Sequence, residues 1–265
     1  MPRRHISALL AAAILAVLAV QASDFWLSKD WKQWSKDDCA KLLVESPWAH
    51  VWRGGRAQGI NPSGAPQAGQ DMNANVQSSG LPNTPNPNYQ AGVGYDLVYA
   101  VQLRSSLPVR EALVRQQQLE QKYDKMNDAD RKAFDTRAAQ ILNRNFDEAI
   151  LVHVDYSRGG AGPNLAGELR SSAQKRENLH VSLVTEDGSK ISASRVDVNQ
   201  KEAAFDAIFP RTANGVPVIT DGQKRFSIQF QSPQLLVVYD TNVAAQPVQV
   251  EFDLSKMIVS GKLNY

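Results

Sequence analysis

Alternation between apolar and polar residues predicts a β-rich region in the later part of the chain. Residues 150–156 carry apolar side chains at every second position, which is typical of a strand with one buried face. The turn residues Glu186-Asp187-Gly188 predict a hairpin. Comparable short apolar runs predict further strands at residues 95–103, 179–183, 191–198, 226–230, 235–239, 248–254 and 257–263.

Between the expected strands at 95–103 and 150–156, a helical period replaces the alternation of apolar and polar residues. Ser105 and Ser106, followed by Pro108, favour the start of one helix. Residues 127–130, with the sequence Asn-Asp-Ala-Asp, favour the cap of a second helix. We therefore predict a helical hairpin at about residues 106–145.

The number and order of these elements indicate the fold class. Several short strands with turn signals between them favour two packed antiparallel sheets. We predict an α+β fold over residues 94–265, a mainly antiparallel β-sandwich of immunoglobulin-like type that carries the helical hairpin as an insertion.

A separate patterned region at residues 23–52 contains every tryptophan of the chain. Ser35, followed three residues later by Asp38, predicts a capping box and a helix that ends before Pro47. Indole side chains concentrate at packed interfaces and partner surfaces. We predict a helical docking segment that either folds back on its own domain, the favoured reading, or binds a protein partner. The predicted docking residues are Trp26, Trp31, Trp34, Trp48 and Trp52.

Residues 53–93 separate this segment from the β-rich region. They include seven Gly, five Pro, six Asn and five Gln, with no Lys or Glu. Such a composition buries too little apolar surface to offset the entropy of ordering, so it predicts a disordered linker.

The first 22 residues have the pattern of a secretory signal peptide. Arg3 and Arg4 precede an apolar run from Ile6 to Val20, and small residues favour cleavage after Ala22. We expect a periplasmic or secreted protein with no stable membrane span after cleavage, and an uncleaved anchor as the alternative.

Charge and cysteine content limit the partners and the covalent chemistry. The net charge is +2, and the expected signal peptide supplies two arginines, so the mature chain is close to neutral. A nucleic-acid partner would need a concentrated positive surface, so none is expected. Cys39 is the single cysteine, which excludes an intramolecular disulfide.

Candidate chemistry is sparse. His153, Asp155 and His180 fall on predicted strands and are the only metal-ligand candidates, but a zinc site needs three or four converging ligands, so neither a metal nor another cofactor is predicted. Cys39 and His50 are close in sequence, yet they match no cysteine-enzyme pattern, and a lone cysteine on a helix is usually a core residue. No catalytic residue is assigned.

Two segments resemble exported bacterial proteins of unassigned function. Trp31–Ala49, with Trp-x-x-Trp, an acidic helix with Leu-Leu and then Ser-Pro-Trp-Ala, resembles their N-terminal element. Phe252–Tyr265 is similar to their C-terminal strand. The resemblance implies an envelope or secreted location and supplies no activity.

Taken together, these patterns favour a non-enzymatic binding or assembly module of the bacterial cell envelope. The alternative is an envelope hydrolase or metal-binding enzyme whose site is assembled from distant residues such as His153, Asp155 and His180.

Overall fold

The fold was analysed in a computed structural model of the chain. The described residues are 24–58, 94–155, 179–199, 204–220, 222–231 and 248–265. The expected signal peptide at 1–22 and the expected strand at 235–239 lie outside them, as does the greater part of the expected linker.

Two helices begin at side-chain caps that the sequence supplies. Ser35 and Asp38 form the predicted capping box, in which the Asp38 N–H donates to Ser35 Oγ (3.1 Å) and the Ser35 N–H donates to Asp38 Oδ2 (2.8 Å). The Asn127 side chain caps the later helix by accepting from the Asp130 N–H at 2.9 Å. The helical elements are α2 (Phe25–Ser28), η1 (Trp31–Gln33), α3 (Lys36–Val44), α5 (Leu107–Glu120), η2 (Tyr123–Lys125), α6 (Asp128–Leu142) and η6 (Leu254–Lys256).

The strands build two main sheets, and their pairings are antiparallel. The first has the order β1-β2-β3-β7-β6, and its strands are β1 (Ala49–Gln58), β2 (Gly94–Leu103), β3 (Ala149–Asp155), β7 (Ala204–Pro210) and β6 (Arg195–Asn199). The second has the order β11-β10-β4-β5, and its strands are β11 (Val248–Asp253), β10 (Arg225–Phe230), β4 (Ser182–Thr185) and β5 (Lys190–Ser192). Two small hairpins, β8 (Thr212–Ala213) with β9 (Val216–Pro217) and β12 (Ile258–Val259) with β13 (Lys262–Leu263), complete the set.

Aromatic side chains join the two sheets face to face. The ring of Phe230 on β10 lies 5.4 Å from those of both Tyr99 on β2 and Phe205 on β7. His50 on β1 lies 5.0 Å from Phe252 on β11. The chain is therefore a mixed α and β protein with two antiparallel sheets that share a hydrophobic core.

Several strands differ from those that the sequence predicts. The expected strand at 191–198 is divided, because β5 pairs in the second sheet and β6 in the first, so the chain changes sheets at residues 193–194. The expected closing strand at 257–263 is instead the short β12–β13 hairpin. Strand β7, which lies between β3 and β6 in the first sheet, was missed, although its residues alternate between buried and half-buried positions from Phe205 onward.

The N-terminal segment continues into the first sheet. Ala49–Gln58 forms β1, which pairs with β2 along most of its length. Residues 53–58, which their composition assigned to the linker, therefore lie in a strand. The tryptophan segment leads directly into the first sheet, and the expected linker does not begin at residue 53. The hydrogen-bonding partner supplied by β2 outweighs the weak strand propensity of the glycines.

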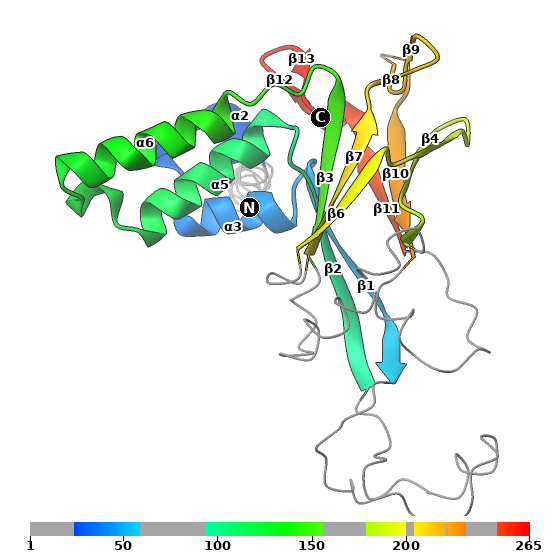
Figure 1. The fold of residues 1–265 in the computed structure, drawn as a ribbon, viewed down its shortest axis with the longest axis horizontal. Coiled ribbons are helices and arrows are strands. Elements are labelled where there is room, and N and C mark those ends of the chain that lie inside the picture. The colour runs from blue at the N-terminus through cyan, green and yellow to red at the C-terminus, as the bar shows by residue number, and fades with distance from the viewer. Residues whose placement is uncertain (1–23, 59–93, 156–178, 200–203, 221, 232–247) are drawn as a thin grey trace, which may run out of the picture.

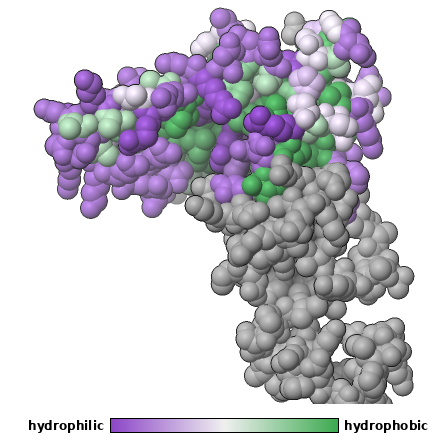
Figure 2. Space-filling model, viewed as in Figure 1, coloured by the Kyte–Doolittle hydropathy of each residue, from purple (hydrophilic) through white to green (hydrophobic). Residues whose placement is uncertain are grey.

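The helices form an arm beside the sheets (Figure 1). Helices α5 and α6 lie side by side as the predicted hairpin, and α3 packs against α5. Hydrophilic residues cover most of the visible surface of this arm in Figure 2. In the part of the chain that the structure describes, no helix is both long and apolar enough to cross a membrane.

The fold generates a prediction at Trp48, which is fully buried and donates from its indole N–H to the carbonyl of Asn264 at 2.6 Å. We expect Trp48→Phe to lower the free energy of unfolding by about 1–3 kcal/mol, because it removes this hydrogen bond and part of a core side chain. Trp31→Phe is the control, since Trp31 is only partly buried. Urea unfolding measures both, and equal losses would contradict the assignment.

Candidate functional site

The five tryptophans lie on the domain's own core. Trp34 and Trp48 are fully buried, while Trp26, Trp31 and Trp52 are partly buried and pack against the same core. Trp34 is held from both sides, because its indole donates to Lys29 O (3.1 Å) and its carbonyl accepts from Arg115 on α5 (3.0 Å). The two buried indoles have no surface left for a partner.

The Cys39 and His50 pair has no reactive character. Burial raises the pKa of the Cys39 thiol to about 11, which keeps the thiol protonated near neutral pH. Burial, followed by the nearby charge of Lys256, lowers the pKa of His50. Cys39 is a core residue of α3, and His50 faces the second sheet beside Phe252, so neither forms a nucleophile–base pair.

His153 has a partner that the sequence did not suggest. It lies opposite Asp206 in the β3–β7 register, and its Nδ1 is 2.7 Å from Asp206 Oδ1. Burial acts to raise the pKa of Asp206, but the hydrogen bond to His153 and the charges of His153, Arg104 and Arg144 outweigh it, so this pKa is lowered. The alternation of apolar and polar residues around Phe205 could have placed Asp206 on the outer face of the sheet. Its pairing with His153 could not have been predicted, because it depends on the register between β3 and β7.

The proposed trio of His153, Asp155 and His180 does not converge. His153 and Asp155 lie on the face of the first sheet that points away from the second, because their neighbours Val152 and Val154 fill the core. His180 is exposed and precedes β4 of the other sheet. No three His, Cys, Asp or Glu side chains within the described ranges are placed to hold a metal ion.

The hydrogen bond between His153 and Asp206 predicts a pH effect on stability. Because the folded-state pKa of Asp206 is lowered, its contribution is present above the unfolded value near 3.8 and is lost as the pH falls through the folded value. Relative to Asp206→Asn, we expect the wild type to be more stable by about 1 kcal/mol at pH 7, after discounting for partial exposure. The advantage should vanish once the pH falls below the lowered folded-state pKa of Asp206.

Urea unfolding at several pH values checks this expectation. Asp197→Asn is the matched control, because Asp197 lies opposite Asp206 on β6 and pairs only with the exposed Arg195. The same pH dependence in both variants would contradict the assignment to the His153 contact.

Among the described carboxyl groups, Glu111 on α5 has the most strongly shifted pKa. Burial and the negative charge of Asp30 raise its pKa to about 7, against a smaller opposing effect of Arg110. The folded chain therefore favours the neutral carboxyl, and ionisation above this pH costs stability.

A second pH prediction follows for Glu111→Gln. Glu111 contributes stability below its unfolded pKa near 4.5, and this contribution is lost as the pH rises through about 7. We expect the variant to exceed the wild type in thermal midpoint at pH 8 and to match it at pH 4.5. Glu120→Gln, at the exposed end of the same helix, should change neither value. A wild-type advantage at pH 8 would refute this interpretation.

A polar cavity of about 390 Å³ lies where the helical arm meets the sheets. It is formed by the start of α5, the segment between α6 and β3, the end of β7 and the C-terminal hairpin. We call it the arginine cavity. Its walls include Ser105, Ser106, Arg110, Arg144, Phe146 and Arg211.

Two of the three arginines are fixed by backbone carbonyls. Arg110 donates to the carbonyls of Ile141 and Leu142, the last residues of α6, and to that of Arg144 beyond its end. Arg211 donates to Phe146 O (2.6 Å) and to Tyr265 O, and its guanidinium lies 4.2 Å from the Tyr265 ring. Arg110 and Arg144 both approach the Phe146 ring, at 5.2 and 5.1 Å. The cavity is therefore a preorganised cationic site.

No local sequence signal identified this cavity. Its serines have the pattern of a helix cap, but Ser106 is an N-cap whose side chain accepts no capping hydrogen bond. The three arginines are far apart in the sequence, and only the packing of the arm on the sheets brings them together.

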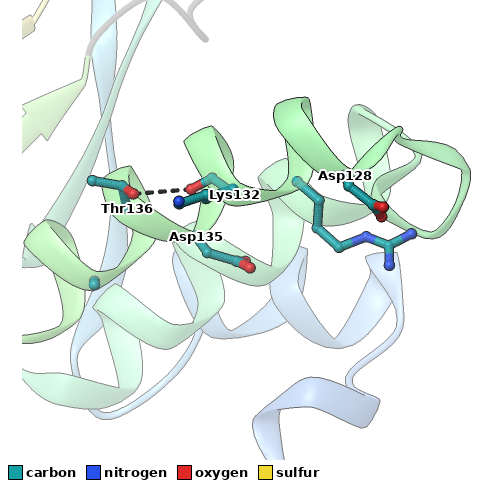
Figure 3. A pocket seen from close by; sticks show the side chains of 6 residues that line it. Asp128, Lys132, Asp135 and Thr136 are labelled. Carbon is teal, nitrogen blue, oxygen red and sulfur yellow. Dashed lines mark hydrogen bonds between the residues drawn. The ribbon is translucent and has the colours of Figure 1, made fainter.

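A second hollow, of about 440 Å³, follows one exposed side of α6 (Figure 3). All its lining residues belong to that helix, including Asp128, Lys132, Asp135 and Thr136. The Thr136 hydroxyl is already used within the helix, donating to Lys132 O at 2.9 Å. Because no second element closes it, we treat this hollow as a solvated helix face.

Comparisons with protein-family models, curated proteins and solved structures found no match for this chain.

Proposed function

We propose that this protein is an exported, non-enzymatic binding or assembly module of the bacterial cell envelope. The observation that carries the proposal is the arginine cavity, where the helical arm, the first sheet and the C-terminal hairpin together hold three arginines. Carbonyls and aromatic rings hold the arginines in place, and positive charges fixed in this way are suited to recognition. The signal-like pattern of residues 1–22 supports export.

The same proposal includes an immunoglobulin-like sandwich. Two antiparallel sheets with aromatic contacts between them support a sandwich, and domains of that architecture commonly present binding surfaces outside the cytoplasm. This second step is an analogy at the level of fold. The tryptophan segment belongs to the proposal in its self-docking form, because Trp34 and Trp48 are buried in the chain's own core.

The alternative is an envelope hydrolase that uses His153. A histidine oriented by an aspartate is one half of a familiar nucleophile-activating arrangement. However, among the described residues the contact at His153 Nδ1 is with Asp206 alone, and no serine or cysteine side chain hydrogen-bonds to His153 there. The pair therefore lacks an activated nucleophile and is better explained as a buried polar contact between strands.

Export provides the first test. We expect a C-terminal fusion to a reporter that is active only outside the cytoplasm to show activity, and removal of residues 1–22 to abolish it. Reporter activity that is unchanged by the deletion, or absent from the full chain, would contradict the proposed location.

Turnover provides the second test. We expect the purified protein to leave chromogenic esters, phosphate esters and glycosides unhydrolysed above background. Hydrolysis that His153→Ala abolishes, and that Asp197→Asn leaves intact, would establish the enzyme alternative in place of the binding module.

A further inference from the structure

Two buried hydroxyl groups in the arginine cavity have no partner. Ser105 and Ser106 are 4% and 1% exposed, and neither Oγ forms a hydrogen bond among the described residues. Both residues line the cavity. Buried polar groups are nearly always hydrogen-bonded, so a pair of orphaned hydroxyls at one cavity points to a group that binds there.

The serines also mark a free helix N-terminus. Ser106 is the N-cap of α5, a helix of 14 residues, and its side chain makes no capping hydrogen bond. The first backbone N–H groups of a helix have no partner within the helix and attract anions. Pro108 has no N–H, and the Ser106 N–H donates to Leu103 O (3.1 Å), so the hydroxyls and the N–H groups of Leu107 and Val109 are the donors at this end of the cavity.

The charge of the cavity is unbalanced. It is lined by Arg110, Arg144 and Arg211, and Asp147 is the single acidic side chain on its described walls. Arg110 and Arg144 share the Phe146 ring, so two positive charges lie close together. The Arg144 guanidinium forms no hydrogen bond or ion pair with the described residues, which leaves its donors available. Bound anionic oxygens would relieve this repulsion.

We propose that the arginine cavity binds a phosphate group, with Ser105, Ser106 and Arg144 as its principal donors. This deepens the proposed function, on which it rests, by naming the ligand class. A phosphate accepts hydrogen bonds on several oxygens from different directions, which suits donors from a helix start, a loop arginine and buried hydroxyls. The cavity volume of about 390 Å³ leaves room for a small organic group attached to the phosphate.

Arg110 and Arg211 have a different role. Arg110 already donates to three carbonyls and Arg211 to two. They hold the walls together and add positive charge, so substituting either one would disturb the fold as well as the ligand. Tests of binding therefore belong at Arg144 and Ser105.

Titration calorimetry of the full mature chain tests the site, with inorganic phosphate and glycerol 3-phosphate as probes at fixed ionic strength. We expect both probes to bind, and Arg144→Gln and Ser105→Ala each to weaken binding about tenfold. Arg137→Gln is the control, because Arg137 is an exposed arginine of α6 and lies outside the cavity. The Arg137→Gln variant should bind phosphate with the same affinity as the wild type.

The ligand-free proteins separate a binding role from a structural role. Ser105→Ala removes a hydroxyl that bonds to nothing in the described chain, so its thermal midpoint without phosphate should be no lower than that of the wild type. A lower midpoint, no binding of either probe, or equal binding by all the variants would overturn the proposal. If the protein binds neither phosphate probe but is exported and hydrolyses none of the chromogenic substrates, the phosphate site is wrong and the broader proposed function still holds.

Vesicles distinguish a lipid headgroup from a soluble phosphate ester. Phosphatidylglycerol vesicles are compared with glycerol 3-phosphate, and phosphatidylcholine vesicles serve as the neutral reference. Vesicle binding that Arg144→Gln weakens and Arg137→Gln does not would support the site with a lipid source. Equal weakening by both substitutions would indicate non-specific charge attraction and count against the site.

Discussion

Trp48 joins three parts of the chain that are far apart in sequence. It ends the segment that carries α3, precedes β1 directly, and donates its indole N–H to Asn264 near the C-terminus. Its backbone carbonyl accepts from the Leu103 N–H at the end of β2 (2.9 Å). The chain has one cysteine and therefore no internal disulfide, so buried contacts of this kind must hold these three segments together.

The position of the arginine cavity depends on this closure. One wall is the C-terminal hairpin, which Trp48 fixes through Asn264, and another is the start of α5, which follows directly from β2. The arginine charges are tolerated there because the guanidinium N–H groups donate to carbonyl oxygens and the guanidinium planes lie against aromatic rings. These contacts partly replace water. The same core packing that closes the fold thus brings together a cationic site whose members have no local relationship in the sequence.

Local signals predicted local structure well. The Ser35–Asp38 capping box, the Asn127 cap and the turn at Gly188, which has a φ of +86°, all depend on residues within a few positions of one another. Long-range features could not be predicted in this way. The change of sheet at 193–194, the His153–Asp206 contact and the arginine cavity are set by strand register and by packing between distant elements.

The structure of residues 53–58 is determined by their pairing with β2, which their composition did not reveal. Glycine, glutamine and arginine around residues 53–58 are poor strand formers, yet β2 pairs with the chain on both sides of the register shift between Arg53 and Arg56. We predicted a helical docking segment followed by a flexible linker. The helix is present as α3, but the residues after it form β1, which is a strand of the first sheet. We therefore infer that residues 34–53 belong to the same cooperative unit as the sheets.

Native-state amide hydrogen exchange tests this claim most directly. We predict that the hydrogen-bonded amides of α3 and of residues 49–53 exchange only through global unfolding, with the same opening free energy as the central strands β3 and β7. Exchange of these N-terminal amides at a much lower opening free energy, while β3 and β7 remain protected, would contradict the account.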